Sequence, residues 1–185
     1  MNLKKYVILY IFILSLILSA CSPAENRATN EMEGIELKLI INKQDISPDD
    51  EVVAKVILTN HNNAQKEIFV PIPKDTEEGI TAVMVERKNQ TLWQLLNPQN
   101  TQDIPNIKER SFYDYVLVQL GANETIEQEF RWNKELLNQE SREIVAANSG
   151  EYILSAFILL DELNNQKDYY EPEKQLISIL GFTVK

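Results

Sequence analysis

The chain has 185 residues, of which 28 are acidic and 18 basic, so its formal net charge at pH 7 is −10. An acidic surface repels the phosphates of nucleic acids and of anionic lipids, which excludes nucleic-acid binding and membrane attachment through a basic patch. With one cysteine and one histidine, the chain also lacks the residues for an internal disulfide or a typical zinc site.

The first twenty residues have the features of a bacterial lipoprotein signal peptide. Lys4 and Lys5 form a positive segment, followed by the apolar run Tyr6–Leu18. A membrane-spanning helix needs about 20 apolar residues, and this run is too short. The run leads into the sequence LSAC, Leu18–Cys21, which resembles a lipobox. The resemblance implies cleavage before Cys21 and a diacylglyceryl thioether on its sulfur, so that acyl chains hold the mature protein on the extracytoplasmic face of the cell membrane.

The segment after the lipobox is predicted to be a flexible tether. Residues 22–34, SPAENRATNEMEG, contain little to bury, and a random coil of this length spans roughly 20 Å. Removal of residues 1–20 takes away two of the 18 basic residues and none of the 28 acidic ones, so the mature chain has a net charge of −12. The acylated cysteine and tether then occupy residues 21–34, and residues 35–185 have the size of one domain.

From Ile35 onward, apolar and polar residues alternate in short runs separated by turn sequences, which is typical of antiparallel sheets. In TIEQEFRW, for example, Ile126, Phe130 and Trp132 share one face. The predicted strands are Ile35–Ile41, Glu51–Asn60, Glu67–Ile72, Ile80–Arg87, Thr91–Leu95, Phe112–Leu120, Thr125–Trp132, Glu151–Leu160 and Gln175–Val184. Only Lys134–Val145 is predicted to hold a helical turn or two.

Eight or nine short strands without a long helix favour an all-β fold, an immunoglobulin-like antiparallel β-sandwich of about eight strands. A closed barrel is the alternative fold, since a period of two alone does not distinguish a closed barrel from two stacked sheets. Tyr152, two residues before Leu154 in SGEYILSA, has the spacing of a tyrosine corner, with an ordinary interfacial tyrosine as the alternative. The large aromatic residues expected in the core are Trp93, Phe130, Trp132 and Tyr152.

Four segments taken in order carry a family resemblance. They are Val52–Val70, Val83–Leu95, Val116–Asn133 and Ile144–Ile158. Together they resemble the BsuPI-type intracellular proteinase inhibitor family, whose tryptophans match Trp93 and Trp132 and whose Gly-x-Tyr strand matches Gly150 and Tyr152. The resemblance implies a sandwich that binds a protein partner, a protease. The lipobox, the turn GANE and the long segment Asn97–Ser111 depart from the family pattern.

The sequence predicts no enzyme and no cofactor or metal. Cys21 is committed to lipid, and His61 lies in the turn sequence NHNN without a G-x-S-x-G serine motif. The acidic sequences SPDDE, KDTEEG and DELNNQKD lack the residue order of a calcium loop and are interpreted as solvated turns.

Two proline-containing segments, Pro71–Gly79 and Asn97–Ser111, are predicted as loops on a rigid sandwich, where binding sites are usually found, or else as plain connectors. The candidate partner contacts are Pro98, Ile104, Pro105, Lys108 and Arg110. We therefore expect a membrane-anchored lipoprotein with a protein-binding sandwich that acts as a proteinase inhibitor. A non-inhibitory structural or assembly module of the cell envelope is the alternative, and small-molecule capture fits less well. The partner's identity and the oligomeric state do not follow from the sequence.

Overall fold

The computed structural model describes residues 26–73, 83–96, 113–160 and 174–185. This part of the chain is all-β, with 13 strands in two sheets and no helix. The strands are β1 (Asn26–Met32), β2 (Ile35–Ile41), β3 (Asp45–Ile46), β4 (Val52–Asn60), β5 (Lys66–Pro73), β6 (Val83–Arg87), β7 (Leu92–Leu96), β8 (Tyr113–Leu120), β9 (Thr125–Trp132), β10 (Glu135–Asn138), β11 (Ile144–Ala146), β12 (Gly150–Leu159) and β13 (Gln175–Val184). Within these ranges there is accordingly no helix of the length and apolar character needed to cross a membrane.

The smaller sheet has four strands in the order β1-β2-β4-β9, and all of its pairs are antiparallel. The sequences of β2, β4 and β9 alternate with period two, so that one face of each of these three strands is mainly apolar. In β2, for example, Ile35, Leu37, Leu39 and Ile41 are at most 1% exposed. This face is one wall of the core.

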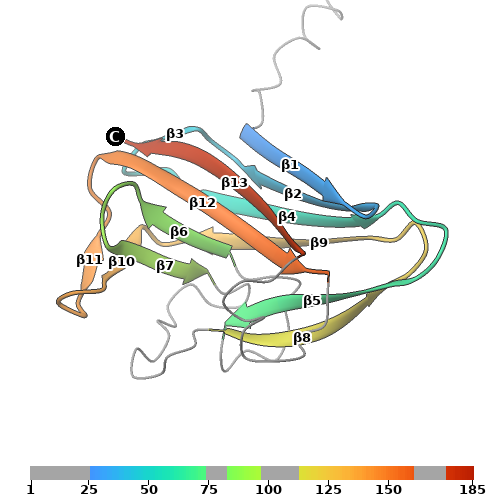
Figure 1. The fold of residues 1–185 in the computed structure, drawn as a ribbon. Coiled ribbons are helices and arrows are strands. Elements are labelled where there is room, and N and C mark those ends of the chain that lie inside the picture. The colour runs from blue at the N-terminus through green and yellow to red at the C-terminus, as the bar shows by residue number, and fades with distance from the viewer. Residues whose placement is uncertain (1–25, 74–82, 97–112, 161–173) are drawn as a thin grey trace, which may run out of the picture.

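The larger sheet has nine strands and curls into a half-barrel (Figure 1). Seven of them follow the order β11-β10-β7-β6-β12-β13-β3, and β5 joins β8 to this path by pairing with β12. The pair β12–β13 runs over ten residues of each strand. The antiparallel pair of β5 and β8 lies on the side of the molecule opposite to β1 (Figure 1).

The core lies between the two sheets and draws buried residues from both. Trp132 of β9 meets Tyr152 of β12 and Phe182 of β13, with ring centroids 5.4 and 5.7 Å away. Each fully buried side chain of this size contributes about 1.5–3 kcal/mol by leaving water. A polar contact also joins the sheets, because the hydroxyl of Ser178 donates to the carbonyl of Leu37 at 2.7 Å.

The predicted tether is wrong for residues 26–34, because Asn26–Met32 form strand β1. β1 pairs with β2 along its whole length, and Ala28 and Met32 pack against the core. The side chains of Asn26 and Asn30 donate to the carbonyls of Gly181 and Ile177 in β13, at 2.9 and 2.5 Å. Only two apolar residues of this strand face inward, and its asparagines face backbone carbonyls. The sequence therefore lacks the apolar alternation of the other strands.

The helical turn predicted for Lys134–Val145 is also wrong, because this segment forms β10 and the start of β11. These strands have four and three residues, too few for a clear period of two. The two-residue strand β3 was not predicted for the same reason, so the count rises from about eight to 13. Pro71 and Pro73, predicted in a loop, end strand β5, and residues 74–82 lie outside the described ranges.

Candidate functional site

Several residues expected to function lie outside the described ranges. They are Cys21 and the loop residues Pro98, Ile104, Pro105, Lys108 and Arg110. His61 is described, and it is exposed in the turn between β4 and β5, with its Nε2 atom 3.9 Å from the carboxylate of Glu36.

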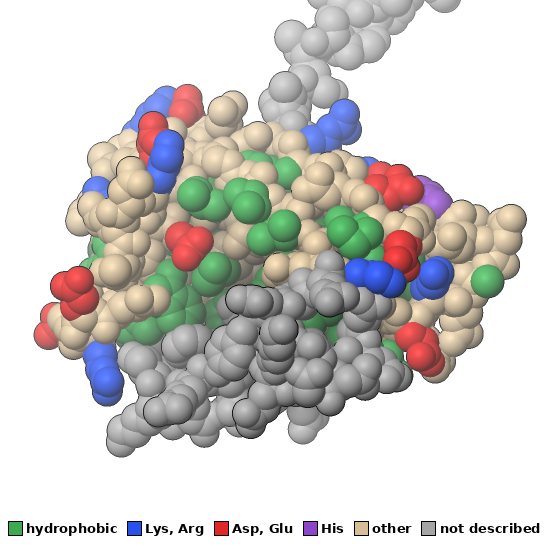
Figure 2. Space-filling view, viewed as in Figure 1, with side chains coloured by type: hydrophobic (Ala, Val, Ile, Leu, Met, Phe, Trp, Pro, Cys, Tyr) green, Lys and Arg blue, Asp and Glu red, His purple; other side chains and the backbone are tan. Residues whose placement is uncertain are grey.

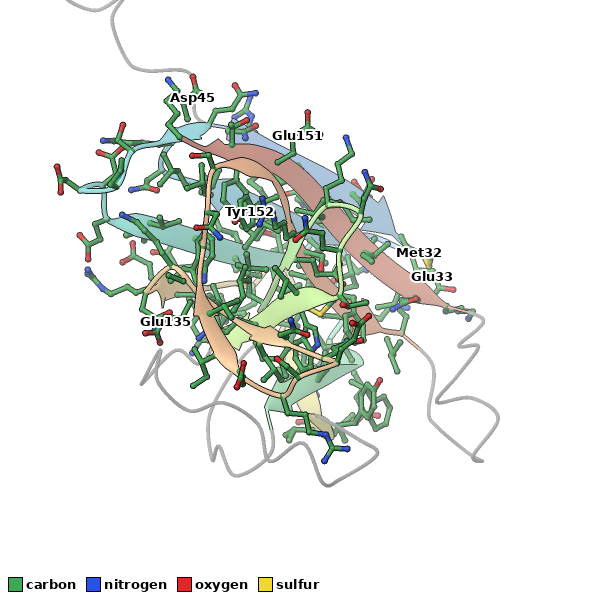
Figure 3. The ribbon with its side chains drawn as sticks, turned by 90° about the vertical axis from the view of Figure 1, so that its left-hand side faces the viewer. Met32, Glu33, Asp45, Glu135, Glu151 and Tyr152 are labelled. Atoms are coloured by element: carbon green, nitrogen blue, oxygen red, sulfur yellow. The ribbon has the colours of Figure 1, made fainter. Side chains whose placement is uncertain are left out.

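The predicted core aromatic residues Trp93, Phe130, Trp132 and Tyr152 are between 0 and 5% exposed. The Tyr152 hydroxyl donates to the carbonyl of Asn148 at 2.7 Å, which is the hydrogen bond expected of a tyrosine corner. Burial raises the pKa of Tyr152, so its hydroxyl stays protonated. Figure 3 shows Tyr152 inside the molecule and the neighbouring Glu151 at the surface. These aromatic rings hold the sheets together and are not exposed to a ligand.

The indole of Trp132 is fixed by two acceptors. Its Nε1 atom donates to Oε1 of Gln94 at 3.0 Å and to the carbonyl of Glu135 at 2.9 Å. Gln94 is 2% exposed and belongs to β7 of the larger sheet. The contact therefore connects the two sheets rather than forming a site for a ligand.

The acidic turn after β3 is held by its own hydrogen bonds. Asp50 accepts from the ammonium of Lys43 and, at 2.8 Å, from the backbone N–H of Ser47, and these contacts lower its pKa. Among the described residues there is no group of three His, Cys, Asp or Glu side chains placed to hold a metal ion. The other two acidic sequences, KDTEEG and DELNNQKD, lie outside the described ranges.

A depression of about 380 Å³ lies beside the β6–β7 and β10–β11 turns. Its lining consists of Asn89, Gln90, Thr91, Leu92, Asn138 and Glu140. The side-chain oxygen of Asn138 already accepts from the backbone N–H groups of Glu140 and Ser141. These hydrogen bonds of Asn138 form the turn after β10, and they account for part of the polar lining of the depression.

Hydrophobic side chains gather over β12 and β13 on the face shown in Figure 2. The most exposed of those on β13 are Ile177 and Ile179, at 37% and 54%. Their backbone is already paired with β12. This surface offers side chains to a partner, but β12 already occupies one edge of β13.

Five strands lie at the edges of the described sheets: β1, β9, β3, β11 and β8. Exposed edges invite pairing with other chains, and proteins protect them with charge, short length or cover. β9 is protected by charge, since it carries Glu127, Glu129 and Arg131, and Lys55 on β4 lies within 3.5 Å of both glutamates. β3 and β11 are only two and three residues long, and β1 is polar and lies against β13.

The outer edge of β8 has none of these protections within the described ranges. β8 is eight residues long, Asp114 is its single charged residue, and among the described strands it pairs with β5 alone. Two consecutive apolar residues at its middle, Val116 and Leu117, are 41% and 45% exposed. Because successive side chains point to opposite faces of a strand, both faces of this edge are apolar. We call the outer edge of β8 with Val116 and Leu117 the β8 edge.

An edge of this kind accepts another extended segment by strand addition, in which backbone hydrogen bonds supply affinity and alternate side chains supply specificity. The sequence predicted this strand as Phe112–Leu120 but assigned it no binding role. The available signal was its uncharged run YVLVQL in a chain that is 25% charged.

No protein-family model matches the chain, and no curated protein matches it. The candidate site therefore rests on the geometry of the sheets.

Proposed function

We propose that the protein is a lipid-anchored, extracytoplasmic lipoprotein of the cell membrane whose immunoglobulin-like β-domain binds a protein through the β8 edge. The observation that carries the proposal is the length and apolar character of this edge, since each of the other described edges is protected. The domain would act by binding, without catalysis, metal or cofactor.

The lipobox Leu18–Cys21 supports the anchor, and the early start of β1 adds a geometric limit. From Cys21 to Asn26 the chain advances five residues, which span at most about 18 Å when fully extended. An acylated Cys21 would therefore hold the β1 side of the domain close to the membrane. The β5–β8 pair lies on the opposite side of the domain, away from the proposed anchor (Figure 1).

Two features support the immunoglobulin-like and BsuPI-like parts of the proposal. The tyrosine corner at Tyr152 is a hallmark of immunoglobulin-like sandwiches, and Trp93, Trp132 and Gly150 take buried or strand positions in two packed sheets. The resemblance to the BsuPI-type family favours a protease as the partner. A non-inhibitory structural or assembly role in the cell envelope is the alternative.

Photocrosslinking in living cells tests the binding site. A photoreactive residue at Leu117 should give one dominant crosslinked species, because this side chain lies at the middle of the β8 edge. The matched control is Ile179, which is similarly apolar and 54% exposed but lies on β13. If neither position crosslinks, or both capture the same species equally, the β8 edge is not the binding site.

Two further measurements separate the parts of the proposal. Metabolic labelling with an alkyne fatty acid should mark the wild-type chain, and Cys21→Ala should lose both the label and the membrane fraction. Residues 22–185 should slow a subtilisin-like or trypsin-like protease saturably if the domain is an inhibitor. If the domain is digested and does not slow the protease even when the domain is in excess, it is not an inhibitor. The role in the cell envelope is then the remaining proposal.

A further inference from the structure

We infer that the β8 edge binds a second copy of this chain, with the two β8 strands pairing antiparallel to make one continuous sheet. This inference rests on the proposed function, because it names the partner of the same edge. Two features of β8 support the inference. A symmetric pair of β8 strands would cover the exposed apolar residues of both copies, and it would keep the single charged residue of each strand away from its own copy.

A two-fold axis that pairs two antiparallel strands stands perpendicular to the sheet, so opposite residues point to the same face. An axis at Leu117 places this residue opposite its own copy on one face. On the other face Val116 lies opposite Val118 of the second copy. The two exposed apolar side chains of β8 thus both become covered by apolar neighbours.

Charge favours the same arrangement. Copies of an acidic chain repel each other wherever their carboxylates meet, and β8 has only Asp114. In the paired strands Asp114 lies opposite Leu120, six positions from its own copy, a separation of about 20 Å. This distance exceeds two Debye lengths at physiological ionic strength, about 8 Å each, so repulsion between the two carboxylates is screened.

Disulfide crosslinking of the full-length, lipidated chain tests the pairing. In the paired strands the two Leu117 Cβ atoms are about 4.5–5.5 Å apart, and Leu117→Cys should join two chains under mild oxidation. The matched control is Ile179→Cys. We expect roughly fivefold or more dimer for the variant at 117 than for the control at 179, because a disulfide requires this proximity.

A second variant separates pairing from the reactivity of the thiol. Leu117→Lys should abolish the dimer of the detergent-solubilised chain in sedimentation, whereas Ile179→Lys should leave it intact, with circular dichroism showing that both variants fold. Crosslinking at both positions alike, or a monomeric wild type, overturns the inference. If the Leu117 photocrosslink captures a different protein, self-pairing is wrong and the proposed function stands. If it captures nothing, both fail.

Discussion

Asn60 joins the turn after β4 to the turn after β8. Its side chain is fully buried, and its Nδ2 atom donates to the carbonyls of Ala64 and Gly121, at 2.9 and 2.8 Å. Its Oδ1 atom accepts from the backbone N–H of Asn62 at 2.9 Å. We expect Asn60→Asp to lower the free energy of unfolding by about 3 kcal/mol, because a carboxylate in place of the amide faces carbonyl oxygens.

Urea denaturation measures this loss, and Asn63→Asp is the matched control, because Asn63 lies in the same turn and is exposed. The control should change the free energy of unfolding by less than about 0.5 kcal/mol. Equal losses in the two variants would mean that the hydrogen bonds of Asn60 do not hold these turns together.

Tyr152 gives a prediction that depends on pH. Tyr152→Phe removes the hydrogen bond to Asn148 and should cost about 1 kcal/mol at pH 7. Burial raises the pKa of Tyr152 above its usual value near 10, so its contribution to stability is complete below pH 10 and is lost as the pH rises through the higher folded value. The difference between wild type and variant should therefore shrink above pH 10. Unfolding at pH 7 and pH 11 measures it, and a constant difference would contradict the prediction.

Among the elements, β1 gives a test of whether residues 26–32 belong to the fold as a strand or form a tether. A chain that begins at Glu33 lacks β1 and should lose about 3 kcal/mol or more, since Ala28 and Met32 leave the core and the carbonyls of β13 lose two donors. It should also aggregate, because the edge of β13 becomes uncovered. A chain that begins at Asn26 should unfold like one that begins at Ser22. Thermal unfolding of the three chains measures these differences. Equal stability of all three would mean that residues 26–32 act as a tether and not as a strand of the fold.

The elements also show how much of the fold could be predicted from the sequence. All nine predicted strands overlap observed ones, because runs such as Ile35–Ile41 alternate strictly and are long enough to show a period. β1 and β10 escaped prediction for different reasons, since β1 faces backbone carbonyls and β10 is short. The β8 strand was predictable from its sequence, but its position at an edge was not. Pairing of Lys66–Pro73 with Tyr113–Leu120 depends on contacts between segments far apart in the chain.

For the whole molecule, the net charge of −12 expected for the proposed mature chain opposes association of two copies, while the proposed pairing of their β8 edges favours it. Added salt screens the repulsion over a Debye length that falls from roughly 20 Å at 0.02 M to roughly 4 Å at 0.5 M. It has little effect on apolar contacts such as Leu117 opposite Leu117. Self-association should therefore strengthen as salt rises.

We expect roughly tenfold tighter dimerisation at 0.5 M than at 0.02 M sodium chloride, which corresponds to about 1.4 kcal/mol of relieved repulsion. Sedimentation equilibrium of the solubilised chain in a non-ionic detergent measures the dissociation constant at each salt concentration. Leu117→Lys should stay monomeric throughout, because screening supplies no attraction of its own. A dimer that weakens with salt would instead indicate an interface held by ion pairs, and the uncharged β8 edge would then not be the surface at which the copies meet.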